Sequence, residues 1–325
     1  MRTTITRAGA AAAILTLGGS LAPTVRACDF CLLSQGISPL ETLNGAGLRL
    51  TQRYALNDSV YDGSDEIANP GTQEEFWTTE ISGFYGIAEG LTLIASLPIR
   101  HTEVDGHLDR HEDGELELHE TTGGDQGVGD LSVLARYTVF RHHTLDATTS
   151  VAVLGGVKFA TGNTRARADD GDFLDAHVQL GTGSTDGLLG VSASYARGRL
   201  AMAANVLGGL ANEGEAGDEA HSFGDWVNYD LTGRYRVMPG VAGASPTQVF
   251  AAFGVAGEAR NRETEGGITV ADSGGHTVYI TPGVQFNFAG RWTAEVSYHH
   301  AVHHDFNGTQ LGEDYKVFGS LTRAF

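Results

Sequence analysis

The chain ends in YKVFGSLTRAF, residues Tyr315–Phe325, and this stretch decides the fold. Its side chains alternate between two faces, so that Tyr315, Val317 and Leu321 share an apolar face while Lys316 lies on the polar one. Alternation with period two is typical of a β-strand that has different surroundings on its two sides. A final strand of this kind, closing on an aromatic residue, predicts a bacterial outer-membrane β-barrel.

The amino-terminal residues have the composition of a secretory signal peptide. Arg2 and Arg7 supply its positive start, and Ala8–Leu17 supply a short apolar stretch. The small residue Ala27 then precedes Cys28, which is where signal peptidase is expected to cut. We therefore predict that residues 1–27 are a signal peptide.

The rest of the chain lacks the sequence of a transmembrane helix. No segment approaches the roughly 20 consecutive apolar residues that a spanning helix needs. In a membrane this chain has to be a barrel, because lipid requires every backbone polar group to be paired. We predict a periplasmic segment over residues 28–45 and a barrel over residues 46–325, in the outer membrane of a Gram-negative type of cell.

The charge balance excludes nucleic-acid binding. The chain has 40 acidic and 21 basic residues, which is a net charge of −19. Three of the 21 bases lie in the predicted signal peptide, so the mature chain has 18 bases against 40 acids and a net charge of −22. Nucleic-acid phosphates need basic surfaces, which such a composition does not provide.

Twelve segments alternate with period two and are predicted to be strands. They are Ala46–Leu56, Glu75–Ile87, Leu91–His101, Val128–Phe140, Ala147–Thr161, Gly187–Arg197, Arg199–Ala211, Asp225–Met238, Gln248–Arg260, His276–Phe288, Trp292–Val302 and Glu313–Phe325. A soluble β-sandwich is the alternative, but it would seldom place this much charge on one face of its central strands. The prediction is an all-β fold, an antiparallel up-and-down transmembrane β-barrel of about 12 strands.

Long and short connections alternate along the chain. Asn57–Glu74, Thr102–Gly127 and Gly162–Asp186 are long, whereas Ala88–Gly90 and Gly198 are short. Barrels of the outer membrane have long extracellular loops and short periplasmic turns, and an even number of strands leaves both termini in the periplasm. The alternation of lengths therefore predicts both the topology and its orientation.

Five motifs, in order, resemble those of the MetA-pathway of phenol degradation family. They are Gln126–Leu131 (QGVGDL) followed by Arg136-Tyr137, Gly156–Gly162 (GVKFATG), Gln179–Asp186 (QLGTGSTD), Tyr279–Gly283 (YITPG) and Asn307–Leu311 (NGTQL). Together they span about the last three-fifths of the chain. The resemblance implies an outer-membrane channel or transporter for small solutes, among them aromatic compounds.

Charged residues on the polar faces are predicted to line the lumen. They are Arg49, Arg53, Glu80, Arg100, Asp130, Arg136, Lys158, Asp230, Arg234, Arg236, Glu295 and Lys316. An excess of bases along a pore wall favours the passage of anions, such as carboxylated aromatics. The alternative is that these charges pair across neighbouring strands and fill a narrow barrel. The sequence leaves both possibilities open.

Histidines form the second group of candidate site residues. They are His107, His111 and His119 in one long connection, and His299, His300, His303 and His304 near the carboxyl end. Imidazoles are common ligands of Zn and Cu, and in an extended strand His299 and His303 share a face. A metal-binding surface protein or metal-uptake component is therefore the alternative function, although solvated loop histidines explain the same pattern.

Two further features concern partners and redox state. The long connections are strongly acidic, as in Asp169 and Asp172, which suits either weak Ca or Mg binding beside lipopolysaccharide or a soluble rim. Cys28 and Cys31 lie at the predicted mature amino terminus, in an oxidising compartment. The two cysteines could form a disulfide, supply half of a metal site or take part in thiol exchange, and the sequence leaves these alternatives open.

An enzyme is not expected. Barrel hydrolases need a serine and a histidine that face lipid, whereas Ser297 and His299 are predicted to point inward, and no G-x-S-x-G motif occurs. We predict no cofactor, apart from the Zn or Cu of the alternative reading. The expected partners are outer-membrane lipid, lipopolysaccharide and a small-molecule solute.

Overall fold

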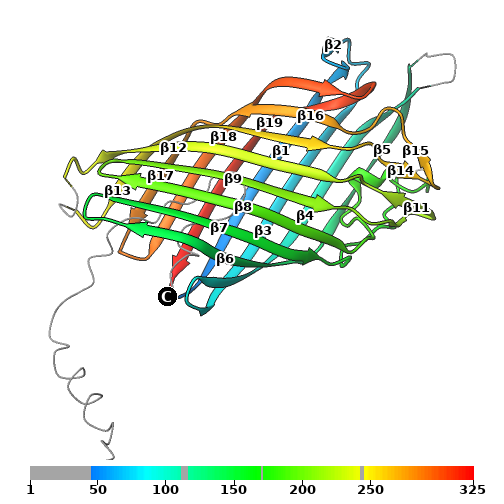
Figure 1. Cartoon of the computed structure of the whole chain (residues 1–325). Helices are drawn as coiled ribbons and strands as arrows, with labels where there is room; N and C mark the ends of the chain where they lie inside the picture. The colour runs from blue at the N-terminus through cyan, green and yellow to red at the C-terminus, as the bar shows by residue number, and fades with distance from the viewer. Residues whose placement is uncertain (1–44, 111–115, 170, 242–244) are drawn as a thin grey trace, which may run out of the picture.

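Antiparallel pairing runs around the whole structure and closes on itself (Figure 1). The computed structural model of the chain describes residues 45–110, 116–169, 171–241 and 245–325. Its sheet closes where β1 pairs with β19 and where β12 pairs with β13, which makes a barrel of twelve wall strands. The predicted fold class is therefore confirmed. The predicted signal peptide and the segment that carries Cys28 and Cys31 lie outside the described residues.

The wall is built from strands in up-and-down order. They are β1 (Ala46–Asp62), β3 (Gln73–Ala88), β4 (Leu91–Arg110), β6 (Ser132–His143), β7 (Ala147–Lys158), β8 (Asp186–Arg197), β9 (Leu200–Leu210), β12 (Trp226–Met238), β13 (Gln248–Arg260), β16 with β17 (Gly275–Ile280 and Gly283–Phe288), β18 (Trp292–Phe306) and β19 (Thr309–Ala324). All twelve predicted segments correspond to these strands. No helix among the described residues is long and apolar enough to cross a membrane.

The two faces of the wall have opposite chemistry. In β12 the outward Leu231 and Tyr235 are exposed by 52% and 46%, while the residue before each of them, Asp230 and Arg234, is buried on the inner face. This arrangement is the reverse of a soluble β protein, in which burial of apolar surface drives folding. Side chains such as Leu231 need an apolar solvent around the barrel, and a lipid bilayer is one.

The two ends of the barrel differ in their connections. We call them the long-loop end and the short-turn end. Further strands extend the long-loop end. One is long, β5 (Leu116–Val128), and five are short: β2 (Asp65–Ile67), β10 (Gly214–Ala216), β11 (Glu219–Ser222), β14 (Thr264–Glu265) and β15 (Ile268–Thr269). At the short-turn end the N–H of Phe325 donates to the carbonyl of Ala46, which brings the last strand beside the first.

The ends also differ in charge. Arginines gather at the short-turn end, where they include Arg141, Arg197, Arg199, Arg291 and Arg323. Acidic residues dominate the long-loop end, for example Asp58, Asp65, Glu66, Glu103, Asp169, Asp172, Glu213, Glu215, Asp218, Glu263, Asp305 and Asp314. The barrel therefore has mouths of opposite sign.

Several predicted boundaries are wrong. The connection expected over Asn57–Glu74 is shorter, because β1 continues to Asp62 and β3 begins at Gln73. Three further differences have a clear physical reason. Thr102–Gly127 was expected to be a loop, but its described ends belong to β4 and β5, which pair outside the apolar band, where alternation is not needed. The strand expected over Val128–Phe140 begins only at Ser132, after an interruption that starts at Gly129. The strand expected over His276–Phe288 is split at Pro282, which has no N–H for the ladder.

Candidate functional site: a charged cavity inside the barrel

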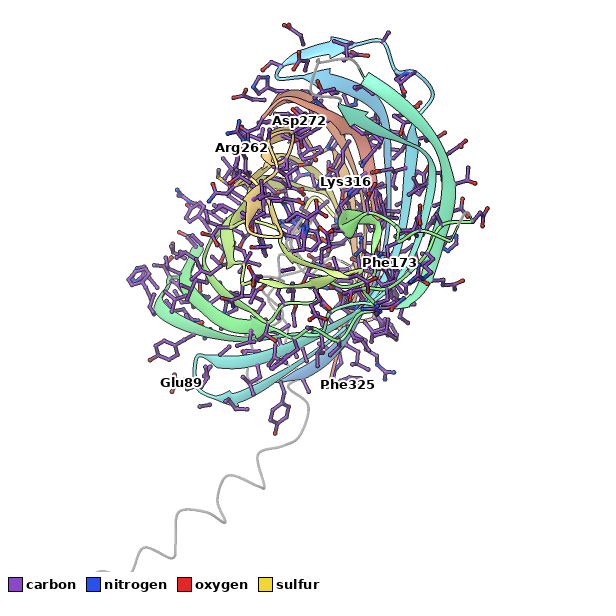
Figure 2. The ribbon with its side chains drawn as sticks, turned by 90° about the vertical axis from the view of Figure 1, so that its right-hand side faces the viewer. Glu89, Phe173, Arg262, Asp272, Lys316 and Phe325 are labelled. Atoms are coloured by element: carbon purple, nitrogen blue, oxygen red, sulfur yellow. The ribbon has the colours of Figure 1, made fainter. Side chains whose placement is uncertain are left out.

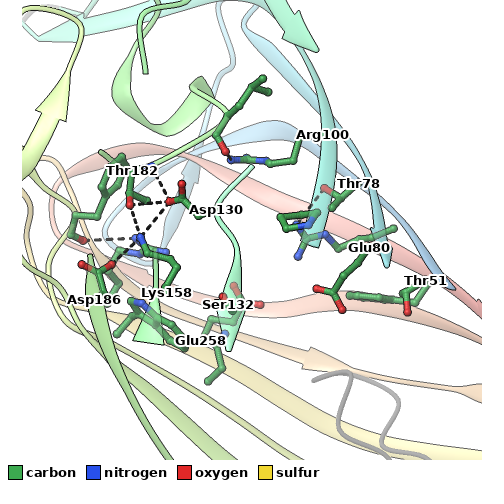
Figure 3. Close-up of a pocket in the computed structure, with 18 of the residues that line it drawn as sticks. Thr51, Thr78, Glu80, Arg100, Asp130, Ser132, Lys158, Thr182, Asp186 and Glu258 are labelled. Carbon is green, nitrogen blue, oxygen red and sulfur yellow. Dashed lines mark hydrogen bonds and ion pairs between the residues drawn. The ribbon is translucent and has the colours of Figure 1, made fainter. Parts of the chain in front are cut away.

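A cavity of about 460 Å³ lies inside the barrel (Figure 3). Its walls are inward side chains of the strands, and part of its lining comes from Leu180 and Thr182 in the connection between β7 and β8. We call this connection, residues 159–185, the inward loop; it contains the short 3-10 helix η2 (Ala176–Val178). Figure 2, which faces the long-loop end, shows the part of the loop that carries Phe173 lying within the outline of the strands.

The sequence of the inward loop explains why it folds back on itself. A Cβ on Gly162 would lie 2.6 Å from backbone atoms of Gly181, so the two glycines allow two backbone segments to touch. The buried Gln179 side chain accepts from the N–H of Ala166 at 2.9 Å and donates to the carbonyls of Ala166 and Leu174. These bonds satisfy the polar groups that a turn inside a barrel would otherwise leave unpaired.

Asp130 ties the inward loop to the wall. One carboxylate oxygen accepts from the N–H groups of Thr161, at 3.1 Å, and Gly162, at 2.9 Å. The other accepts from the N–H and the hydroxyl of Thr182, both at 2.9 Å. A single side chain thus binds both ends of the loop, and its position in the interruption before β6 gives it the reach to do so.

Lys158 supplies the counter-charge at this anchor. Its Nζ lies 3.3 Å from Asp130 and 2.6 Å from Asp186, and it also contacts the hydroxyl of Thr182 (Figure 3). Asp130, Lys158 and Asp186 come from the first three motifs of the family resemblance. Those motifs therefore meet in space, and in this structure they build the anchor of the inward loop.

Lys316 is the centre of a second buried cluster, inside the ring of strands in Figure 2. Its Nζ lies 2.7 Å from Glu258 of β13 and 2.6 Å from Glu313 of its own strand. The hydroxyl of Tyr279 donates to Glu313 as well. Burying an ammonium group is costly unless carboxylates compensate it, and here two of them do.

All twelve predicted lumen residues lie on the inner face. Those lining the cavity are Arg49, Arg53, Glu80, Arg100, Asp130, Lys158 and Glu295. Those buried around it are Arg136, Asp230, Arg234, Arg236 and Lys316. Arg234 is fully buried with a Glu295 oxygen 3.7 Å from its guanidinium, and Asp230 accepts two bonds of 3.0 Å from Asn205.

Two of the cavity arginines use only neutral acceptors. Arg53 donates to the hydroxyl of Thr78 at 3.3 Å, and Arg100 donates to the carbonyls of Gln179 and Leu180 at 2.9 and 3.3 Å. Among the described residues neither guanidinium has a carboxylate within 4.0 Å. Their charges therefore face the cavity without the direct carboxylate contacts that Lys158 and Lys316 make, and Asp130 and Glu258 act on them only from farther away.

Aromatic residues of the cavity were missed by the sequence reading. Phe318, Phe223 and Trp226 line the cavity, and none of them was named from the sequence as a lumen residue. The signal for Phe318 was present, because it lies two residues after the inward Lys316. Trp226 turns inward because Gly209 leaves room for its indole ring, where a Cβ would clash at 2.3 Å.

The histidines are divided between the two faces of β18. His299 and His304 are buried inside, whereas His300 and His303 are exposed outside. The expectation that His299 and His303 share a face is wrong, because a register shift of β18 against β16 reverses the alternation beyond Ala301. The described part of the chain contains no group of three or more histidine, cysteine or acidic residues placed to hold a metal.

The other predicted metal ligands lie in the β4–β5 hairpin. The backbones of His107 and His119 are direct partners across this hairpin, and His111 lies outside the described residues. Metal binding by the histidines, like a disulfide between Cys28 and Cys31, remains a prediction from the sequence.

The arrangement was compared with known proteins. A scan against models of protein families and a search of curated proteins both found no match. Among solved structures, the COG4313 outer membrane channel from Pseudomonas putida F1 aligns over 87% of this chain and 96% of its own, with a TM-score of 0.64 and 15% identity. This chain therefore shares the β-barrel fold of that protein.

Two other barrels align less well. The NanC porin covers 85% of this chain and 98% of its own, at 10% identity and a TM-score of 0.41. A FadL homologue from Pseudomonas aeruginosa covers 87% and 91%, at 10% identity and a TM-score of 0.38. The likeness to the COG4313 channel shows that the fold expected from the motifs is correct; what passes through this barrel has to be argued from its own cavity.

Proposed function

We propose that this protein is a channel of the bacterial outer membrane that admits small solutes through the barrel interior. The observation that carries the proposal is the closed wall of twelve strands, apolar outside, around a cavity of about 460 Å³ lined by charged and polar side chains. The signal peptide exports it, the short-turn end faces the periplasm, and the acidic long-loop end faces outward beside lipopolysaccharide. The shared fold with the COG4313 channel supports this assignment.

We propose that the barrel has no enzymatic role. Ser297 and His299 form the pair that a hydrolase would need, with 3.3 Å between Oγ and Nε2. Both are buried on the inner face, away from the lipid that a barrel hydrolase attacks. In a channel the same two groups belong to the polar lining of the lumen.

The passage prefers anions. Arg53 and Arg100 face the cavity without a direct carboxylate contact, while Lys158 and Lys316 each contact two carboxylates. Fixed charges at close range set the selectivity of a pore. The inward loop narrows the route, so solutes pass beside Leu180 and Thr182.

Reconstitution into a planar bilayer tests the proposal. We expect stable conductance steps, with a reversal potential across a salt gradient that shows anion preference. A folded, heat-modifiable barrel that never conducts would refute an open channel. Conductance with cation preference would support the channel but refute the proposed anion preference.

A further inference from the structure

Arg53 and Arg100 occupy one row across three neighbouring strands. Arg53 of β1 is the direct partner of Thr78 of β3, and Thr78 is the direct partner of Arg100 of β4. Strands in a sheet lie about 4.8 Å apart, so the two arginine backbones are separated by roughly 10 Å. Both side chains line the same cavity.

This row brings two positive charges together, and neither guanidinium has a carboxylate within 4.0 Å among the described residues. Thr78 and the loop carbonyls offer neutral oxygens only, and the buried Nε of Arg53 has no hydrogen-bond partner. Like charges in a poorly solvated site repel, and an unsatisfied buried donor carries a further desolvation penalty. A bound anion would relieve both, and a carboxylate suits guanidinium groups because it accepts two hydrogen bonds at once.

The cavity offers apolar surface beside these charges. Phe318 of β19 is the direct partner of Arg53 across the strand pair, and its ring lines the cavity. Leu180, Phe223 and Trp226 contribute further apolar surface to the same lining. The cavity volume lies within the range of about 300–1,000 Å³ that is typical of small-molecule sites.

Negative groups in the same lining limit the charge of the ligand. Glu80, Glu258 and Glu295 also face the cavity, so a dianion or a phosphate would meet repulsion once its first charge was compensated. A ligand with one carboxylate and an uncharged body meets no such repulsion. The pattern of charges and rings therefore favours a monocarboxylate.

We propose that the cavity contains a binding site for small monocarboxylates with an apolar body. The carboxylate binds between Arg53 and Arg100, and the body packs against Phe318. The site rests on the proposed function, because it would hold the solute part-way along the channel. Such a site makes the barrel a substrate-selective channel.

Equilibrium dialysis of the detergent-purified protein with radiolabelled benzoate tests the site directly. We expect saturable binding that weakens at least about 10-fold in Arg53→Gln and in Arg100→Gln, since a hydrogen bond to a charged group contributes enough for such a change. Arg323→Gln is the matched control, because this arginine stacks on Trp292 and Phe325 at the short-turn end. Its affinity for benzoate should equal that of the parent protein.

Companion probes test the apolar half. Benzyl alcohol, which lacks the charge, and inorganic phosphate, which lacks the apolar body, should each bind at least about 10-fold more weakly than benzoate. Phe318→Ala should weaken the binding of benzoate while leaving the binding of acetate unchanged. Phosphate binding as strong as benzoate, or benzoate binding unchanged in both arginine variants, would overturn the proposal.

Two further measurements separate failure of the site from failure of the channel. Heat-modifiability on a gel shows that each variant is folded, and bilayer conductance is recorded on the same preparations. Arginine-dependent benzoate binding without conductance would refute the proposed channel function and support the proposed binding site. Conductance without saturable benzoate binding would support the proposed channel function and refute the proposed binding site.

Discussion

The bases inside the barrel fall into two groups that the sequence alone does not separate. Lys158 and Lys316 each touch two carboxylates, and both help to hold elements together. Arg53 and Arg100 touch hydroxyl and carbonyl oxygens and keep their charges for the cavity. The positive residues of a lumen therefore have two different roles. Some form ion pairs that hold the structure together, and others keep a charge that a solute can contact.

Position explains the difference. Lys158 is the last residue of β7, where the inward loop leaves the wall, so it contacts acidic residues of the loop anchor. Arg53 and Arg100 lie on β1 and β4, where the strand between them offers Thr78.

Asp130→Ala should lower the free energy of unfolding more than the other substitutions. It removes four accepted hydrogen bonds and one partner of a buried ammonium group, and breaking such a pair costs roughly 3–5 kcal/mol. Urea unfolding in lipid vesicles measures the loss, and proteolysis within residues 159–185 should accelerate. Asp146→Ala, in an exposed short turn, is the control. Equal unfolding midpoints for the two variants would contradict the role of the anchor.

Lys316→Met should have a smaller effect. It leaves Glu258 and Glu313 without their cation, but both remain partly exposed, so we expect a loss of about 1–2 kcal/mol. A double-mutant cycle with Glu258→Gln should recover part of that loss, because the second change removes a repelling charge. Additive losses in the cycle would show that the pair is not coupled.

Arg53→Gln should barely change stability. Among the described residues its side chain makes one hydrogen bond, to Thr78, so the free energy of unfolding should move by less than about 1 kcal/mol. The anion preference measured from the reversal potential should fall, because a charge facing the solute is lost. A destabilisation as large as that of Asp130→Ala would place Arg53 in the structural group instead.

Alternation along the strands was sufficient to predict the fold and the inner face. Each lumen residue named from the sequence points inward, because a closed sheet with lipid outside leaves polar side chains no other direction. Pairing could not be predicted in the same way. Whether Lys158 meets Asp186, or Arg53 meets only Thr78, depends on cross-strand register and on where a loop folds.

Local irregularities account for the remaining errors. The register shift between β16 and β18 places His303 on the outside of the barrel. The alternation of side chains in the sequence of β18 gives no sign of this shift. The inward loop was expected to be an ordinary outside loop, because its contacts depend on Gly162, Gly181 and Gln179 meeting in three dimensions. Such features depend on single residues, whereas the barrel depends on a pattern repeated twelve times.

The smallest predicted effect concerns pH at the inward loop. His177 of η2 lies 2.6 Å from Glu74; burial lowers the pKa of His177, but the Glu74 carboxylate overcomes this and raises that pKa to about 10. A raised pKa means that the ion pair stabilises the folded loop fully below the unfolded value of about 6.5 and is lost as pH rises through about 10. Conductance should therefore be steady around neutral pH.

His177→Gln provides the control for this pH effect. The parent channel should become noisier above the pKa of the pair, as the loop loses one of its contacts, while the variant should behave alike on both sides of it. A step in conductance between weakly acidic and neutral pH would contradict the raised pKa, and would direct attention to another titrating group.

The opposite charges of the two ends have an electrical consequence. Acidic side chains surround the long-loop mouth and arginines surround the short-turn mouth, so fixed charge changes sign along the axis. Mobile ions accumulate where the fixed charge attracts them, and an applied voltage either fills or empties the stretch between the mouths. The barrel should therefore act as a weak diode, carrying more current at one polarity than at the other, and raising the salt concentration should remove the asymmetry.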